Sequence, residues 1–239
     1  MPVIQKLSCV VERVVPHGDR VYTLTLRPER PVPRFQAGQF LHLALDRYEP
    51  TGFWPESRVF SIASPPSQRE AVSITYAVHG PFTQRMEREL IEGREAWIKM
   101  PYGDFVVDGG SDVALFAGGT GVTAFTAFLE ALPPDTPHQV TLAYGARSSD
   151  LLIYRGVLER SAARLPSLQV LYFVEDAADA AAASMLPGRV SVEAVWARLA
   201  RPAETHFYIS GPPPMLRSIG DDLRARGVPP EAIHIDAWE

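Results

Sequence analysis

The C-terminal half of the chain contains three short turns whose residue types could bind a phosphate or nucleotide: 118–121 (Gly-Gly-Thr-Gly), 144–148 (Tyr-Gly-Ala-Arg-Ser) and 210–215 (Ser-Gly-Pro-Pro-Pro-Met). The first turn follows a short apolar run and precedes apolar residues at helical spacing. Its glycines permit positive φ and the close approach of another molecule. The exposed N–H groups at the start of a helix favour a phosphate. Taken alone, this turn is explained equally well as a tight strand–helix connection.

A second kind of chemistry is carried by Arg58-Val59-Phe60-Ser61 in the N-terminal half. In a strand, Arg58 and Phe60 share one face, while Val59 and Ser61 share the other. The guanidinium fork suits a phosphate, and an aromatic ring beside it offers a flat surface to a planar cofactor. By itself the segment fits better with an edge-strand arginine next to a core phenylalanine.

The elements that must position the three turns form an alternating pattern from about residue 109 onward. Strands are expected at 113–117, 139–144, 168–174, 206–210 and 233–235, and helices at 121–132, 151–164, 191–200 and 213–226. This alternation predicts a parallel sheet with helices on both faces, which binds ligands beyond the carboxyl ends of its strands. The three turns should therefore share one rim. Segment 176–184, almost all alanine and aspartate, is expected to be a loop or a frayed helix that takes no part in the chemistry.

The N-terminal hundred residues instead show short alternating runs separated by proline-rich gaps. Strands are expected at 10–15, 21–26, 40–45, 72–78 and 96–100, with one helix at 82–91 that turns Met86 and Leu90 inward. Such spacing predicts an antiparallel β-barrel. We therefore expect two domains, an antiparallel barrel at 1–107 and an α/β domain with a parallel sheet at 108–239.

Composition limits the classes of function. The chain has 239 residues, 46% hydrophobic and 21% charged, which is ordinary for a globular protein with two modest domains. A formal net charge of −5 gives no general attraction to nucleic acid or anionic lipid. No apolar run approaches the ~20 residues of a membrane helix, and the first residues lack a signal-peptide pattern, so no membrane insertion and a cytoplasmic location are expected. The single cysteine, Cys9, excludes an internal disulfide and an all-cysteine metal cluster.

Five motifs occur in order along nearly the whole chain: 58–61 (Arg-Val-Phe-Ser), 102–105 (Tyr-Gly-Asp-Phe), 118–121, 210–212 (Ser-Gly-Pro) and the aromatic Trp238. In this order they resemble the ferredoxin–NADP reductase-like superfamily of flavin-dependent reductases. The resemblance implies a flavin-binding barrel at 1–107 followed by an NAD(P)-binding α/β domain at 108–239. It also implies an oxidoreductase that passes hydride from NAD(P)H to a bound flavin and then electrons to an acceptor.

Within the barrel, the resemblance implies that Arg58 holds the flavin pyrophosphate and that Phe60 lies against the isoalloxazine ring. Ser61 would present its hydroxyl near flavin N5, where hydride arrives. Segment 79–83 corresponds to a second pyrophosphate loop at a helix start. The implied flavin-binding residues are Arg58, Val59, Phe60, Ser61, His79, Gly80, Phe82 and Thr83.

Within the α/β domain, the resemblance implies that Arg147 and Ser148 contact the phosphates or adenosine ribose of the nucleotide. Trp238 would cover the flavin. The implied catalytic residues are Ser61, Ser210 and Trp238. The residues that would face the dinucleotide are Gly119, Thr120, Gly121, Val122 and Thr123, with Gly211, Pro212 and Met215 beside the nicotinamide.

The chain departs from the superfamily pattern at four positions. Phe60 replaces a commoner tyrosine, so stacking is kept and a hydroxyl is lost. Ala124 stands where proline is frequent, and Ser210 stands where cysteine is frequent, which bears on the tuning of hydride transfer. Trp238 is penultimate, whereas plant-type members end on the aromatic residue itself.

The choice of nucleotide remains open between NADH and NADPH. Glu175 and Asp176 follow an expected strand, where carboxylates repel a 2′-phosphate and accept a bond from a ribose hydroxyl, which favours NADH. Arg147 favours NADPH. FAD is the expected flavin, with FMN as the alternative, and no metal is expected.

The electron acceptor is expected to be external, because one cysteine cannot hold the four-cysteine [2Fe–2S] cluster of fused members. The candidates are a ferredoxin or flavodoxin, an oxygenase component, free flavin or a ferric chelate. A second interpretation is a non-catalytic flavin- or nucleotide-binding regulatory or electron-transfer subunit of a larger complex.

Overall fold

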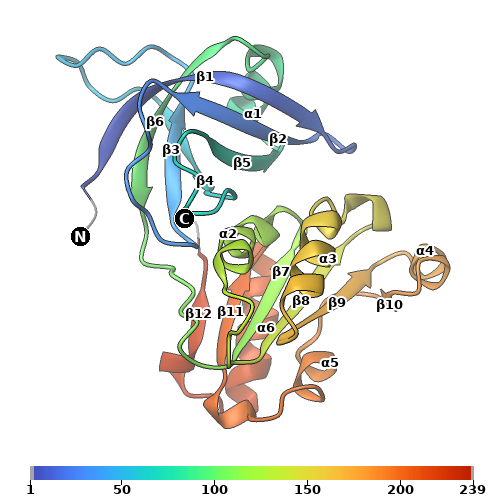
Figure 1. Ribbon diagram of the computed structural model, residues 1–239. Coiled ribbons are helices and arrows are strands. Elements are labelled where there is room, and N and C mark those ends of the chain that lie inside the picture. Colours follow the sequence, from blue (N-terminus) through green and yellow to red (C-terminus); the bar gives the residue numbers. More distant parts are fainter. Residues whose placement is uncertain (1–2, 238–239) are drawn as a thin grey trace. The chain divides into compact units, whose positions relative to one another are not determined.

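The computed structural model describes residues 3–237, and the chain divides into two compact units, 1–106 and 107–239. Figure 1 shows the first unit in blue to green and the second in green to red. No helix among residues 3–237 is both long and apolar enough to cross a membrane.

The N-terminal unit is a six-stranded antiparallel sheet that curls into a nearly closed barrel, which confirms the predicted fold class (Figure 1). The sheet order is β4-β3-β6-β1-β2-β5. Near its two edges, the N–H of Ala63 donates to the carbonyl of Ser73 at 2.8 Å, and this bond draws β4 and β5 together. The strands are β1 Gln5–Pro16, β2 Val21–Pro28, β3 Phe40–Ala44, β4 Ser57–Ser61, β5 Val72–Ala77 and β6 Glu95–Tyr102.

Alternation along the strands fills the barrel. Leu24 and Leu26 of β2 are completely buried, whereas Thr25 between them is half-buried. Helix α1, Pro81–Glu89, adds Phe82 and Met86 to the same core. The predicted helix ran to residue 91, but the helix ends at Glu89, and Leu90 follows as its buried C-cap.

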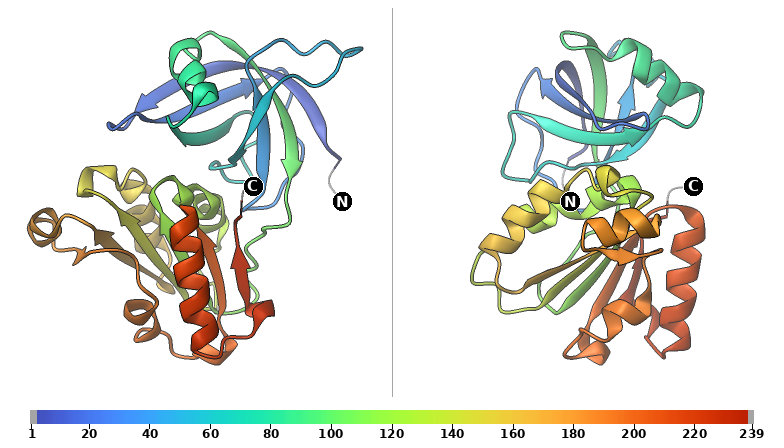
Figure 2. Two further views of the ribbon diagram at one scale, coloured as in Figure 1. Left: turned by 180° about the vertical axis from the view of Figure 1, so that it is seen from behind. Right: turned by 90° about the vertical axis from the view of Figure 1, so that its right-hand side faces the viewer.

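The C-terminal unit is a parallel six-stranded sheet of order β10-β9-β8-β7-β11-β12, again as predicted. Helices lie on both faces of this sheet, as the two views of Figure 2 show. One face buries apolar residues of α5 and α6 against β7, β9 and β11. The strands are β7 Val113–Gly118, β8 Val140–Ala146, β9 Leu168–Val174, β10 Leu186–Pro187, β11 His206–Ser210 and β12 Ile233–Ile235, and the helices are α2 Thr123–Ala131, α3 Arg155–Arg164, α4 Ala177–Ala182, α5 Val192–Trp196 and α6 Pro213–Ala225.

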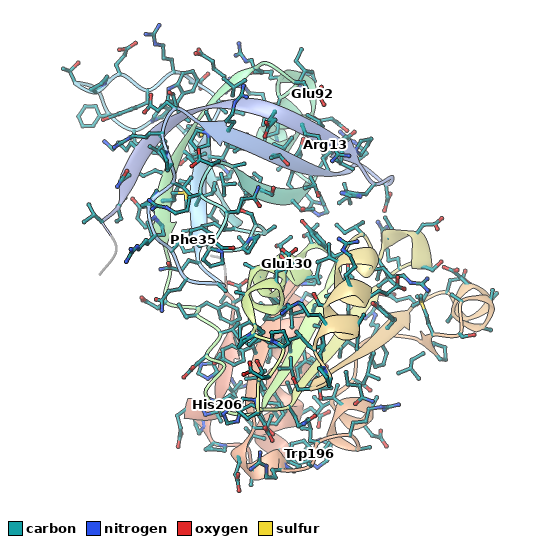
Figure 3. The ribbon with its side chains drawn as sticks, viewed as in Figure 1. Arg13, Phe35, Glu92, Glu130, Trp196 and His206 are labelled. Atoms are coloured by element: carbon teal, nitrogen blue, oxygen red, sulfur yellow. The ribbon has the colours of Figure 1, made fainter. Side chains whose placement is uncertain are left out.

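Several helices are shorter than the apolar spacing predicted. A 3₁₀ turn, Gly119–Val122, precedes α2, and a second one, Ser149–Leu151, precedes α3. Helix α3 starts only at Arg155, because the backbone of Leu152 is not helical, with φ of −78° and ψ of 60°. Helix α5 covers five residues of the predicted ten. It packs its last residue, Trp196, flat against Phe207 of β11, with ring centroids 6.0 Å apart (Figure 3).

Within segment 176–184, residues 177–182 form the short helix α4. Of the two alternatives predicted for this segment, a loop or a frayed helix, the structure thus has the helix. The Asp176 carboxylate accepts the N–H groups of Ala178 and Asp179, both at 2.9 Å, and so caps the helix. The two-residue strand β10 that follows was not predicted, because it is too short to carry an alternating pattern.

Candidate functional site

The ends of the parallel strands align at one edge of the sheet. Gly118 at the end of β7 lies opposite Gly145 of β8, which in turn lies opposite Phe173 of β9. On the other side of β7, Ser210 of β11 lies opposite Ala117. We call this edge the carboxyl rim, formed by 118–121, 145–149, 174–179, 210–215 and 235–236. The three turns singled out in the sequence are neighbours along it, as predicted. His206, which begins β11 and is labelled in Figure 3, marks the opposite edge.

The turns after β7 and β11 pack directly on each other. A Cβ built on Gly121 would lie 2.4 Å from the carbonyl oxygen of Ser210, and one built on Gly118 would lie 2.6 Å from Met215 Sδ. Gly119 differs, because it has φ of +54° and its Cβ position meets no atom of the described residues within 4 Å. Close packing therefore requires glycine at 118 and 121, whereas the positive φ requires it at 119. Because no described atom lies near the Cβ position of Gly119, space remains beside the turn at that residue.

The residues that continue this turn into α2 face inward. Val122 is fully buried, and Thr123 is 3% exposed. The Thr123 hydroxyl donates to the carbonyl of Thr120 at 2.8 Å. Contacts to a nucleotide from Val122 or Thr123 would therefore come from the backbone. Across the rim, Pro212 is exposed, and Gly211 and Met215 are half-buried.

Ser210 is tied to a buried carboxylate. Its hydroxyl donates to Asp236 Oδ2 at 2.8 Å, and each residue is only 3% exposed. The N–H of Asp236 donates to the carbonyl of Ile209 at 2.9 Å, so the chain after β12 is held along the end of β11. A buried carboxylate needs such donors, because burial without them is costly. The predicted catalytic hydroxyl thus has an acceptor within the protein.

The turn after β8 is joined to the segment that follows β9. The N–H of Asp176 donates to the carbonyl of Arg147 at 3.2 Å. Ser149 donates its N–H and its hydroxyl to the two oxygens of Asp179, at 2.6 and 2.7 Å. Arg147 is exposed and Ser148 is half-buried, so the predicted contact residues lie on the outer side of this junction.

In the barrel, β4 places Arg58 and Phe60 on the same face, as predicted. Arg58 lies opposite Leu43 of β3, and Phe60 lies opposite Leu41. Phe60 is half-buried against the barrel core and meets Tyr76 edge-on, with centroids 6.3 Å apart. Its ring is therefore only partly covered by the described protein.

The Arg58 side chain connects β4 to the start of α1. Its guanidinium carbon lies 5.0 Å from the centroid of the Phe82 ring, a cation–π contact. Arg58 Nη2 also lies 2.9 Å from a carboxylate oxygen of Glu56, in an ion pair between two half-exposed side chains. Such exposed pairs are weak, so the guanidinium can exchange this partner for a phosphate. The two implied pyrophosphate-binding segments, 58–61 and 79–83, thus come together within the barrel.

The start of α1 is only partly available to a ligand. The N–H groups of His79 and Gly80 both donate to the Thr83 hydroxyl, at 2.9 and 3.1 Å. Pro81 has no N–H. The N–H groups of Phe82 and Thr83 lie in the first turn, where a helix offers them no acceptor. These two are the donors that could meet a phosphate.

The other face of β4 carries the remaining two residues of the motif. Val59 lies opposite His42 of β3, and Ser61 lies opposite Phe40. The His42 ring meets Tyr102 edge-on at 4.8 Å. Burial and the nearby Lys99 lower the pKa of His42, which keeps this imidazole neutral at pH 7.

The structure brings to the carboxyl rim two further residues that sequence reasoning missed, Asp236 and Asp179. Asp236 follows the last predicted strand directly, so the rule that ligands lie beyond strand ends could have found it. Asp179 carried no such signal, because it lies within a segment of alanine and aspartate. Trp238 lies outside the described residues.

Comparison with known proteins agrees with this geometry. A family model of the oxidoreductase NAD-binding domain matches residues 115–221. The chain is 30% identical over 212 residues to DmpP, the reductase component of phenol 2-monooxygenase from Pseudomonas sp. (strain CF600), covering 87% of this chain and 58% of that relative. It is 28% identical over 211 residues to the ferredoxin reductase component of 3-ketosteroid-9-alpha-monooxygenase from Mycolicibacterium smegmatis, covering 86% of this chain and 56% of that relative. The chain thus spans little more than half the length of these relatives.

Solved structures share the fold over nearly the whole chain. The cytochrome P450 reductase GcoB of Amycolatopsis has a TM-score of 0.83 at 20% identity, over 99% of this chain and 70% of that one. A ferredoxin NADP+ reductase from Neisseria gonorrhoeae with bound FAD and NADP has a TM-score of 0.77 at 21% identity, over 98% of both chains. Residues 115–221 thus match the oxidoreductase NAD-binding domain, the chain is similar to oxygenase reductase components over 86–87% of its length, and it shares the fold of the solved reductases.

Proposed function

We propose that the chain is a flavin-dependent NAD(P)H oxidoreductase with a flavin-binding domain at 1–107 and a nucleotide-binding domain at 108–239. The observation that carries the proposal is the packing of the turns after β7 and β11 at the carboxyl rim. Gly118 and Gly121 allow the two turns to pack closely, while the Cβ position of Gly119 meets no atom of residues 3–237 within 4 Å. A ligand at such a rim meets backbone N–H groups and a helix start, the usual setting for a dinucleotide.

The barrel residues fit the pyrophosphate of FAD. The Arg58 guanidinium lies on the Phe82 ring beside the start of α1, where the N–H groups of Phe82 and Thr83 belong to the first turn and have no acceptor within the helix ladder. One cationic fork and two backbone donors suit a dianionic group, and the half-buried ring of Phe60 offers a surface for an isoalloxazine. We propose FAD as the flavin and keep FMN as the alternative. When bound, the flavin supplies hydride acceptance from the nicotinamide and release of electrons singly or in pairs.

At the carboxyl rim, we propose that 119–123 bind the dinucleotide through their backbone and that Arg147 and Ser148 contact its adenosine end. Gly211, Pro212 and Met215 would lie beside the nicotinamide. Ser210 would act as a positioning residue, because its proton is already donated to Asp236. Ser61 and Trp238 remain proposed flavin contacts.

For the electron acceptor, we propose an oxygenase component or a ferredoxin. The support comes from the two relatives, which are named as the reductase or ferredoxin reductase components of monooxygenases. We also propose a cytoplasmic location, the compartment that supplies reduced nicotinamide nucleotides.

The test is anaerobic reduction of the purified chain after reconstitution with FAD. NADH or NADPH should bleach the flavin absorption band near ~450 nm, and a one-electron acceptor such as ferricyanide should restore it. A preparation that binds no added flavin would end the proposal. Flavin that binds but is not reduced by either nucleotide would favour a regulatory or electron-transfer subunit instead.

A further inference from the structure

The turn between β1 and β2 has a strained backbone. Gly18, Asp19 and Arg20 follow one another with φ of +84°, +47° and +57°. Glycine adopts such angles freely, whereas a residue with a Cβ does so at a cost, because its Cβ approaches the following carbonyl oxygen. Residues kept in this conformation persist only where the surrounding structure holds them. Contacts outside the turn must therefore hold Arg20 in place.

Arg20 is tied at both of its ends to the segment that forms α1. Its carbonyl oxygen accepts the N–H of Val78 at 3.0 Å, directly before segment 79–83. Its guanidinium donates to both carboxylate oxygens of Glu87 on α1, from Nε to Oε1 at 3.1 Å and from Nη2 to Oε2. One residue of the turn thus holds both the chain that enters α1 and the helix itself.

The Glu87 carboxylate accepts a third hydrogen bond from β2. The Tyr22 hydroxyl donates to Glu87 Oε1 at 2.9 Å. The Tyr22 ring stacks on Tyr76 of β5, with centroids 5.5 Å apart, and Tyr76 is the ring that Phe60 meets edge-on. The Glu87 side chain is 23% exposed. Three hydrogen bonds to one partly covered carboxylate form a network, which fixes geometry better than an isolated exposed ion pair does.

We propose that Glu87 is a positioning residue of the flavin site, which holds the start of α1 against the β1–β2 turn through Arg20 and Tyr22. The inference rests on the proposed function, in which the N–H groups of Phe82 and Thr83 meet the pyrophosphate of FAD. Backbone donors cannot follow a ligand as a flexible side chain can, so their contribution depends on where the helix start is held. Glu87 lies four residues beyond Thr83 and acts on the phosphate only through the helix.

The experiment measures FAD affinity by fluorescence titration of the flavin-free chain and the phosphorus NMR shifts of the bound pyrophosphate. The variants are Glu87→Gln, which keeps the side-chain size and removes the charge, Arg20→Ala, which keeps the Cβ and removes the guanidinium, and the two combined. Asp46→Asn is the matched control. Asp46 accepts two hydrogen bonds from Arg85, at 2.7 and 3.1 Å, and so holds the same helix from the loop after β3. Thermal unfolding of each variant shows whether it is folded.

We expect Glu87→Gln and Arg20→Ala each to weaken FAD binding by about ten-fold, because the phosphate donors are no longer held in place. The combined variant should also lose only about ten-fold, since both changes remove the same link. In each of these proteins the phosphorus shifts of bound FAD should move toward those of free FAD, which a loss of stability alone would not cause. Asp46→Asn should stay within about two-fold in affinity and keep the shifts of the unmodified chain.

Three results would overturn the inference. The first is a folded Glu87→Gln variant that binds FAD with unchanged affinity and unchanged phosphorus shifts. The second is an additive loss in the combined variant, which would make Arg20 and Glu87 independent of each other. The third is an equal effect of Asp46→Asn, which would mean that any anchor of α1 serves.

The proposed function can fail separately from this inference. FAD that binds and responds to Glu87→Gln, but is reduced by neither NADH nor NADPH, would leave the positioning role standing and remove the oxidoreductase. An unmodified chain that binds no FAD would remove both.

Discussion

Substituting alanine for each glycine of the turn after β7 should destabilise the C-terminal unit by amounts that differ from one position to the next. In Gly121→Ala the new methyl would lie 2.4 Å from the Ser210 carbonyl oxygen and 2.5 Å from its carbon, both backbone atoms. The first contact is about 1 Å short of a relaxed van der Waals distance, and the backbone of β11 cannot rotate away as a side chain can. Overpacking of this kind costs about 3 kcal/mol or more.

Two neighbouring substitutions supply the comparison. In Gly119→Ala the methyl meets no atom of the part of the chain that the structure describes, and only the positive φ is penalised, at about 1–2 kcal/mol. In Gly118→Ala the nearest atom is Met215 Sδ, at the flexible end of a thioether side chain, so we expect about 1–2 kcal/mol. Gly121→Ala should therefore be the most damaging of the three.

Hydrogen exchange of the β7 and β11 amides measures this order, because it reports the opening free energy of the C-terminal unit separately from the barrel. The reasoning would be refuted if the β7 and β11 amides exchanged as slowly in Gly121→Ala as in the unmodified chain. It would also be refuted if Gly119→Ala proved the more damaging of the two, since conformation rather than packing would then dominate.

Three further predictions concern Ser210 and Arg58 of the candidate site and His234 of the parallel sheet. Ser210→Ala leaves the buried Asp236 carboxylate without its hydroxyl donor and should lower the free energy of unfolding in urea by about 1.5–3 kcal/mol. Ser210→Cys should recover part of this loss. Equal stability of the two variants and the unmodified chain would contradict the role of the hydrogen bond. Burial and the neighbouring His206 lower the pKa of His234 from 6.5, so the unfolded chain takes up this proton more readily, and stability should fall as pH drops through that value. His234→Phe should flatten this pH dependence, and an unchanged slope in the variant would count against it. Arg58→Ala should weaken FAD binding by about 10–100-fold, measured by flavin fluorescence, with partial recovery in Arg58→Lys; unaltered affinity would remove Arg58 from the pyrophosphate site.

Much of the architecture could be predicted from local periodicity in the sequence. Alternating residues at 21–26 and 72–78 formed antiparallel strands, and the strand–helix rhythm after residue 109 formed the parallel sheet. The period of side chains along a strand also placed Arg58 and Phe60 on one face. Helix ends were less predictable, because non-helical residues such as Leu152 interrupt an apolar spacing that would otherwise continue the helix.

The location of the carboxyl rim could be predicted, because parallel strands all end at the same edge of the sheet. The sequence likewise predicted, through its glycine turns and the Arg58 motif, which kinds of ligand the two units bind. What only the tertiary structure decided is which groups are still available to such ligands. The Ser210 hydroxyl, both donors of Ser149 and the N–H groups of His79 and Gly80 all have acceptors inside the protein. The pairings of Ser210 with Asp236 and of Ser149 with Asp179 join segments that become neighbours only when the sheet order is set, and no local period encodes that order. The pairings of His79 and Gly80 with Thr83 are local, but they depend on the exact start of helix α1.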